Sequence, residues 1–433
     1  MSTQLRLSTA VHLHGIGQNL PQFALQTVQV FFVGLIIGME RNVLPTMRHL
    51  FGLESHAFFF LASFVVSFGL VKGALNFVAG DLSDRVGRKR VLLWGWLAGI
   101  PIPLLIFFAP NWLWIVAANV FLGINQAFTW TMTVTSQIDL AGNRQRGLAV
   151  GINEAMGYIA VGLAGLGTGY LALAWGPRWA LLGFALLVMV LALLLLPWVR
   201  DTLPWAQAEG QRQRPSDPLV QSTLSAAPEG RWQSFVQVSF QDRTSRALCQ
   251  GGVANKIADT LVWVMFPVYL HFRGQGLVHI GWITGIYAMI WGLCQFWTGH
   301  LADSVGRKAP ILSGFFLLTL GLIGVALVHH FAAWMLAAAV MGMGMALLYP
   351  NLIAAMADRA LPATRGKTLG IYRYWRDTGY AIGGLLLGAA AQWADAVLPT
   401  IWLTAAIIAA SGFWIALAVQ ETHPKARQEC VKR

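Results

Sequence analysis

Nine ionisable side chains lie inside long apolar stretches of this sequence, where charges are costly. A charged side chain at the centre of a bilayer costs at least ~2.5–3.5 kcal/mol, so each is a candidate for binding a solute, carrying a proton or forming an internal ion pair. Five are basic and four are acidic: Glu40, Arg41, Lys72, Glu154, Lys256, Asp259, Arg373, Arg376 and Asp377.

Their spacing predicts which of them meet. Lys256 and Asp259 are three residues apart and share one face of a helix. Arg373 and Asp377 are four apart, so we expect them to pair locally and to leave Arg376 free for an anionic solute or for an acidic partner. The alternative is that these charges only fix helix packing, in which case removing one partner of a buried pair costs ~3–5 kcal/mol.

Three of the carboxylates, Glu40, Glu154 and Asp259, are candidate proton carriers. Glu40 lies near the end of its apolar stretch, just before Pro45, so we expect it at a gate and not at the membrane midplane. Histidines lie only near the ends of the stretches or outside them. Because imidazole is the commonest transition-metal ligand, we expect no metal site.

Polar and aromatic residues on the same stretches extend the candidate site. They are Asn125, Gln126, Trp130, Gln295, Tyr349 and Trp375. Tryptophan is frequently only an anchor at the membrane surface. Trp130 and Trp375 fall deeper and beside polar residues, so we expect both to line a cavity.

The elements that hold these residues are long and apolar. Of the 433 residues, 56% are apolar and 11% charged, with a mean hydropathy of +0.59. Soluble domains carry about 25% charged residues, so this composition excludes a disordered chain, a nucleic-acid-binding domain and an ordinary soluble enzyme. A bilayer core needs ~20 apolar residues per helix. Twelve stretches qualify, near 22–45, 57–80, 91–109, 112–135, 147–173, 178–199, 250–271, 279–300, 310–329, 332–355, 367–391 and 398–420.

This pattern predicts an all-α integral membrane protein, and the basic residues predict its orientation. With both termini on the same side, the segments on that side hold 22 Lys and Arg residues and the opposite segments three. Cytoplasmic loops carry the excess of Lys and Arg. We therefore expect a multi-pass protein of the cell inner membrane with both termini in the cytoplasm.

The two halves of the chain repeat each other at an offset of 219 residues. Gly73 matches Gly292, Trp130 matches Tyr349, and Glu154 matches Arg373. An offset that spans six helices predicts two parallel six-helix bundles, with a substrate site between them near the midplane. We expect bundles at 1–199 and 247–433, joined by a cytoplasmic linker at 200–246 whose end, 231–246, is a candidate interfacial helix.

A charged loop follows the second stretch and recurs after the eighth. Its residues are Gly80, Asp84, Arg85, Gly87, Arg88 and Lys89 in the first copy and Gly299, Asp303, Gly306, Arg307 and Lys308 in the second. We expect Gly80 to allow a close helix approach and Gly87 to allow a tight turn. Asp84 and Arg88 are expected to clamp helices through charge-assisted hydrogen bonds.

This loop resembles the signature G-x-L-x-D-r-x-G-r-k of the major facilitator superfamily, and both copies fit it. The resemblance covers essentially the whole chain and implies a monomeric secondary transporter in which two halves rock around a central site, with the loops as a conformational latch. Two family marks are missing. Asn119 stands where many proton-coupled members have arginine, and the fifth stretch lacks the Gly-Pro pair of drug antiporters.

No phosphate-binding glycine loop of the ATPase type occurs, so we expect energy from an ion gradient. The leading hypothesis is proton-coupled efflux of a small molecule, with protons and the lipid bilayer as the other partners. The alternatives are a proton-coupled transporter of a small organic or inorganic anion, and a receptor or scaffold that does not transport. We expect no enzymatic activity, no cofactor and no nucleic-acid partner.

Overall fold

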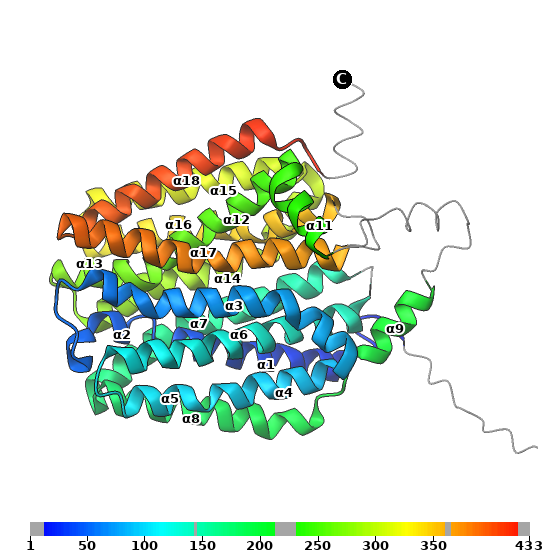
Figure 1. The fold of residues 1–433 in the computed structure, drawn as a ribbon, viewed down its shortest axis with the longest axis horizontal. Helices are drawn as coiled ribbons and strands as arrows, with labels where there is room; N and C mark the ends of the chain where they lie inside the picture. Colours follow the sequence, from blue (N-terminus) through cyan, green and yellow to red (C-terminus); the bar gives the residue numbers. More distant parts are fainter. Residues whose placement is uncertain (1–12, 143–144, 213–230, 360–364, 423–433) are drawn as a thin grey trace, which may run out of the picture.

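The computed structural model describes residues 13–142, 145–212, 231–359 and 365–422, and within these ranges every regular element is a helix. Eleven of the described helical segments are long and apolar enough to cross a membrane. The helices run roughly parallel to one another, with the N-terminal helices in the lower part of Figure 1 and the C-terminal helices in the upper part. The described part of the chain is therefore a bundle of helices, most of them suited to a membrane by length and composition.

The first part of the chain contains α1 (Leu20–Gly38), α2 (Val43–Thr46), α3 (Phe58–Val86), α4 (Arg88–Gly99), α5 (Pro101–Phe107), α6 (Trp112–Ala141), α7 (Arg146–Trp175) and α8 (Pro177–Leu195). The second part contains α12 (Arg243–Thr260), the π-helix η4 (Leu261–Met265), α13 (Phe266–Phe272), α14 (Leu277–Val305), α15 (Lys308–Leu327), α16 (Phe331–Arg359), α17 (Arg365–Ala394) and α18 (Leu398–Ala418).

Two helix pairs join these parts: α3 packs against α17, and α7 packs against α14. Glycines allow the close approach. A Cβ on Gly69 would lie 2.5 Å from the Ala381 nitrogen, and one on Gly162 would lie 2.8 Å from the Gly285 oxygen. Gly80 lies on the same face of α3 as Gly69, yet a Cβ there would meet nothing within 4 Å. The expectation that Gly80 packs closely was therefore wrong, because the helices diverge toward this end.

Both copies of the charged loop form the same turn. Gly87 and Gly306 have φ of +96° and +92°, a conformation that disfavours other residues. The Asp201 carboxylate accepts a hydrogen bond from the Arg88 backbone nitrogen at 3.2 Å. Glu421 accepts bonds from the Arg307 and Lys308 nitrogens at 2.9 and 3.1 Å. We call the end of the bundle that carries these two turns the motif end.

The loop charges connect helices within one half. Arg88 bonds Asp84 of α3 at 2.6 Å and Asp139 of α6 at 3.3 Å. Arg307 bonds Asp358 of α16 at 3.2 Å. Lys89 and Lys308 each donate to a backbone carbonyl, of Pro197 and Ala416 respectively, and Arg85 is exposed. The side chains at 299 and 303, expected in the second copy, lie outside the described residues.

The segment between the halves contains α9 (Leu203–Arg212), α11 (Arg231–Val236) and the π-helix η3 (Gln237–Gln241). The expected helix over 231–246 is therefore shorter, because Asp242 caps the N-terminus of α12 by accepting from Ser245 N at 2.6 Å. Trp375 of α17 donates to Ser239 at 2.8 Å and stacks on Phe235. Trp375 thus contacts the linker helix.

Candidate substrate site between the halves

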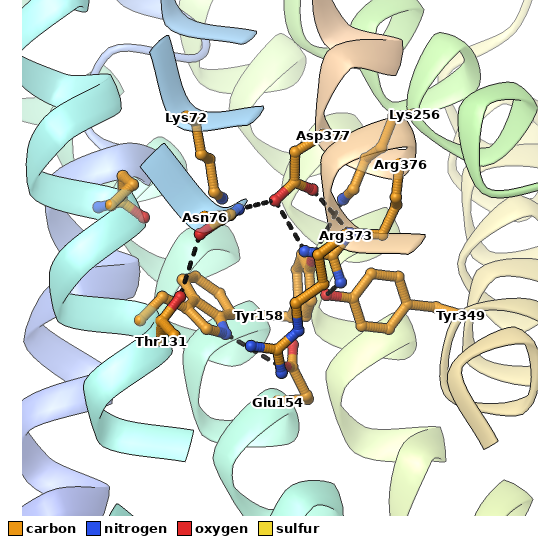
Figure 2. Close-up of a pocket in the computed structure, with 12 residues that line it drawn as sticks. Lys72, Asn76, Thr131, Glu154, Tyr158, Lys256, Tyr349, Arg373, Arg376 and Asp377 are labelled. Atoms are coloured by element: carbon orange, nitrogen blue, oxygen red, sulfur yellow. Dashed lines mark hydrogen bonds and ion pairs between the residues drawn. The ribbon is translucent and has the colours of Figure 1, made fainter. Parts of the chain in front are cut away.

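A pocket lies between the two halves, with about 340 Å³ of empty space including its mouth. The first half contributes Lys72, Asn76, Gln126, Trp130, Thr131, Glu154 and Tyr158. The second half contributes Lys256, Tyr349, Arg373, Arg376 and Asp377. The lining thus contains four basic and two acidic side chains, from α3, α6, α7, α12, α16 and α17 (Figure 2).

Arg376 and Asp377 form a two-point ion pair inside this pocket. The Nε–Oδ1 distance is 2.7 Å and the Nη2–Oδ2 distance is 2.8 Å. Arg376 also donates to the Tyr349 hydroxyl at 2.9 Å, and Asn76 donates to Asp377 Oδ2, the oxygen that also accepts from Arg376 Nη2. The expected pairing of Asp377 with Arg373 is wrong, because the long Arg376 side chain bends back onto its sequence neighbour.

Because Arg376 is paired with Asp377, Arg373 is the arginine of the pocket that could bind an anionic substrate. It is partly exposed, and no hydrogen bond or ion pair of its side chain occurs among the described residues. Figure 2 shows its side chain reaching toward Glu154, whose charge acts on it. Glu154 accepts from Trp130 Nε1 at 3.0 Å, and its second oxygen has no partner in the described part of the chain.

Lys72 is a second basic side chain without a carboxylate partner within 4 Å among the described residues. Only 7% of it is exposed. Its ammonium lies 5.3 Å from the Phe68 ring and 5.5 Å from the Trp130 ring, which are cation–π distances. Lys72 and Arg373 therefore place positive charge on the pocket wall from opposite halves.

A second charged cluster adjoins the pocket and joins the halves. Asp259 pairs with Arg41 of the first half at 2.9 Å and with Lys256 at 3.3 Å. Tyr380 also donates to it. The expected contact between Lys256 and Asp259 is present. Lys256 lies within 5.6 Å of four aromatic rings, those of Tyr158, Trp291, Tyr349 and Tyr380.

Glu40 lies in the irregular segment between α1 and α2 and is fully buried. One carboxylate oxygen accepts from Asn119 at 3.4 Å, and the other has no partner within the described ranges. An ionised carboxylate in such a place is costly. Glu40 therefore lies apart from the pocket, in a position suited to a proton-binding group.

Some predicted residues are away from the pocket, and others were missed. Asn125 donates to the Gly95 carbonyl at 2.8 Å behind the lining, and Gln295, Trp375, Arg41 and Asp259 do not line it. Three residues that line the pocket were not predicted from the sequence: Asn76, Thr131 and Tyr158. Two of them had a detectable pattern: Asn76 matches Gln295 and Tyr158 matches Asp377 at the same offset of 219.

The sequence model of the Major Facilitator Superfamily matches residues 28–248 and 248–429. The chain belongs to this family, whose members are transporters and not enzymes. It is 22% identical to the galactose-proton symporter of Escherichia coli K12 over 307 residues, 67% of this chain and 65% of the symporter. The match thus spans less than two thirds of that relative.

Two further proteins are similar. An uncharacterised transporter of Salmonella typhimurium is 23% identical over 74% of this chain and 76% of its own length. The quinolone resistance protein NorA of Staphylococcus aureus is 26% identical over 28% of this chain and 32% of its own. Among solved structures, the human organic anion transporter MFSD10 has a TM-score of 0.65 at 16% identity, covering 91% of this chain and 98% of its own, which shows a common fold.

Proposed function

We propose that this protein is a symporter that carries a small organic anion together with a proton, by opening the central pocket alternately to the two sides of the membrane. We take α17 as a twelfth span, since it is 30 residues long and its charges face the pocket. The two six-helix halves would then rock against each other along the α3–α17 and α7–α14 contacts.

The observation that carries the proposal is the pair of basic side chains without a bonded carboxylate, Arg373 and Lys72, on one pocket wall each. A buried cation without a counter-ion is costly, and a bound carboxylate supplies the missing charge and hydrogen-bond acceptors. Arg376 already has Asp377 as its partner. We therefore propose that the anion binds between Arg373 and Lys72.

The rest of the wall favours a substrate with a flat apolar body. The Trp130 and Tyr158 rings lie 5.4 Å apart, and the Tyr158 and Tyr349 rings 5.7 Å apart. Aromatic side chains offer large apolar faces together with a polar tip. A small aromatic or unsaturated carboxylate fits this lining better than a polyol, which needs many neutral hydrogen-bond partners.

Glu154 supports coupling to protons. Its carboxylate and a substrate carboxylate would compete for the Arg373 guanidinium, since both are anions. A proton on Glu154 removes that competition and leaves Arg373 to the substrate. Proton and anion then bind together, which favours symport over the efflux expected from sequence. Glu40, buried and without a cation partner among the described residues, is a second candidate carrier.

We also propose that the motif end faces the cytoplasm, because the basic residues of the chain concentrate in the segments at that end. The α3 glycines support a pocket that is closed at the opposite end and looser at the motif end, since Gly69 is tightly packed and Gly80 is not. This arrangement corresponds to an inward-facing state of an inner-membrane transporter with cytoplasmic termini.

The test is a thermal unfolding screen of the purified protein with benzoate, benzylammonium and benzyl alcohol, three molecules of the same size and different charge, at pH 6 and pH 8. A ligand at 100 times its Kd stabilises by about 2.7 kcal/mol. We expect benzoate to raise the Tm, more at pH 6, and the other two to have little effect. A larger shift with benzylammonium than with benzoate would refute the anion proposal.

Two arginine variants test whether benzoate raises the Tm by binding in the pocket. Arg373→Ala should abolish the benzoate shift. Arg273→Ala is the matched control, because Arg273 follows α13 outside the pocket, where its guanidinium lies over the Tyr269 ring. Its benzoate shift should equal that of the unmodified protein.

A further inference from the structure

A second, smaller cavity lies between the halves, apart from the residues of the substrate pocket. Its wall is formed by the segment between α1 and α2, by α7, by α14 and by the π-helix η4. The polar residues on it are Arg41, Asn42 and Thr284, and the rest of the lining is glycine, alanine and valine. Nothing in the proposed transport of an organic anion uses this cavity.

Two buried nitrogen donors in this cavity lack a partner among the described residues. They are Arg41 Nε and Asn42 Nδ2, on side chains that are 6% and 1% exposed. The Thr284 hydroxyl lies 2.7 Å from Asn42 Oδ1 and 2.9 Å from the Ile280 carbonyl oxygen, and when it donates to Oδ1 the amide nitrogen is turned away from Thr284. Leaving a buried N–H group without an acceptor costs about as much free energy as losing a hydrogen bond. A ligand that offers an acceptor atom would therefore be stabilised in this cavity.

The charged side chains around this cavity indicate that the missing hydrogen-bond acceptor is an anion. Arg41 and Lys256 both bond the single carboxylate of Asp259. Glu40, next to Arg41 in sequence, forms no ion pair within the described part of the chain and accepts only from the Asn119 amide. When Glu40 carries a proton, the cluster of Arg41, Lys256 and Asp259 has one uncompensated positive charge.

We infer that this cavity binds a small inorganic anion of the halide class, held by Arg41 Nε and Asn42 Nδ2. The free polar groups are donors, which excludes a metal cation. The cavity is lined by small residues such as Gly162, Gly165 and Val262, and its empty space of about 260 Å³ including its mouth is less than that of the substrate pocket. Arg41 uses its other edge for Asp259, so the anion and the carboxylate occupy different sides of one guanidinium.

The anion would contact both halves of the protein. Arg41 and Asn42 belong to the first half, and Thr284, which orients the Asn42 amide, belongs to α14 of the second. Binding therefore favours the state in which the halves touch at the end opposite the motif end. A halide thus acts as a ligand of this conformation and is separate from the transported substrate.

The experiment titrates chloride into purified protein in methanesulfonate buffer at constant ionic strength, with Tm as the readout. We expect a saturable rise in Tm. Asn42→Asp replaces the donor by a carboxylate of the same shape and should raise the half-saturating chloride concentration about tenfold or more. Thr284→Val, which removes the hydroxyl that orients the amide, should weaken the response in the same direction and serves if Asn42→Asp does not fold.

Thr46→Val is the matched control, because the Thr46 hydroxyl is buried close by in α2 and does not line the cavity. Its chloride response should match that of the unmodified protein. The response should also persist in Arg373→Ala. A response lost in Arg373→Ala but kept in Asn42→Asp would place the halide in the substrate pocket and overturn the inference. No response of the unmodified protein would mean that the cavity holds water only.

Discussion

Glu154 and Arg373 occupy equivalent positions in the two halves of the chain, 219 residues apart, and both line the same pocket. One is acidic and the other basic, so the repeat places opposite charges on opposite walls. Because neither forms an ion pair within 4 Å in the described ranges, a proton and an anion can each change the balance between them.

Glu154→Gln tests this balance. The variant keeps an oxygen for the Trp130 hydrogen bond and removes the charge that competes for Arg373. We expect Glu154→Gln to bind benzoate more tightly than the unmodified protein at the same pH. Calorimetric titration of the two proteins measures this. Equal or weaker binding by the variant would mean that Glu154 does not compete with the substrate for Arg373.

We expect the variants Arg376→Ala and Arg373→Ala to differ in stability. Arg376→Ala leaves the buried Asp377 carboxylate without its cation and should destabilise the protein by about 3–5 kcal/mol. Arg373→Ala removes a side chain with no bonded partner in the described structure and should change stability by about 1 kcal/mol or less. Urea unfolding of the two variants compares them. Equal destabilisation would mean that Arg373 also holds a structural partner.

A side chain added at Gly87 should strain the turn that this residue forms. Its φ is +96°, and a Cβ added there would lie 2.1 Å from an Asp201 carboxylate oxygen. Gly87→Ala should therefore cost more than the ~1–3 kcal/mol of an unfavourable backbone alone. Gly80→Ala is the matched control, since a Cβ there meets nothing within 4 Å and the residue is helical. Thermal unfolding should show a lower Tm for Gly87→Ala only.

Asp242 should stabilise the protein equally at pH 5.5 and pH 8. Burial alone would raise its pKa, but hydrogen bonds from Ser245 and the Arg359 guanidinium outweigh this and hold the pKa below its usual value. A lowered pKa means that the stabilisation is present above the unfolded value near 4 and disappears as pH falls through the folded one. Asp242→Ala should cost about 1 kcal/mol equally at pH 5.5 and pH 8. A cost that differs between these two pH values contradicts the assignment.

Local patterns in the sequence predict long apolar helices, and the described structure contains eleven helices of that kind. The position of the substrate site stays a prediction. Apolar length marks the helices, and the 219-residue offset relates the residues of the two halves. The same offset relates Tyr158 to Asp377, which both line the pocket, and Asn76 to Gln295, of which only Asn76 does.

The partners of the charges could not be predicted, because they depend on side-chain reach and on packing between helices. The i,i+4 rule selected Arg373 for Asp377, whereas the flexible Arg376 side chain reaches its neighbour. The contact of Arg41 with Asp259 joins helices of different halves. The first helix breaks before Val43, close to Pro45, and the π-helix at Leu261–Met265 directly precedes the turn that contains Pro267.

Counterflow in proteoliposomes tests the central claim most directly. Vesicles loaded with unlabelled benzoate are diluted into medium with a trace of labelled benzoate, with and without an inward proton gradient. We expect labelled uptake that internal benzoate stimulates, that the proton gradient accelerates, and that Arg373→Ala abolishes. Counterflow of benzylammonium in place of benzoate, or uptake of benzoate that an outward proton gradient accelerates, would contradict it.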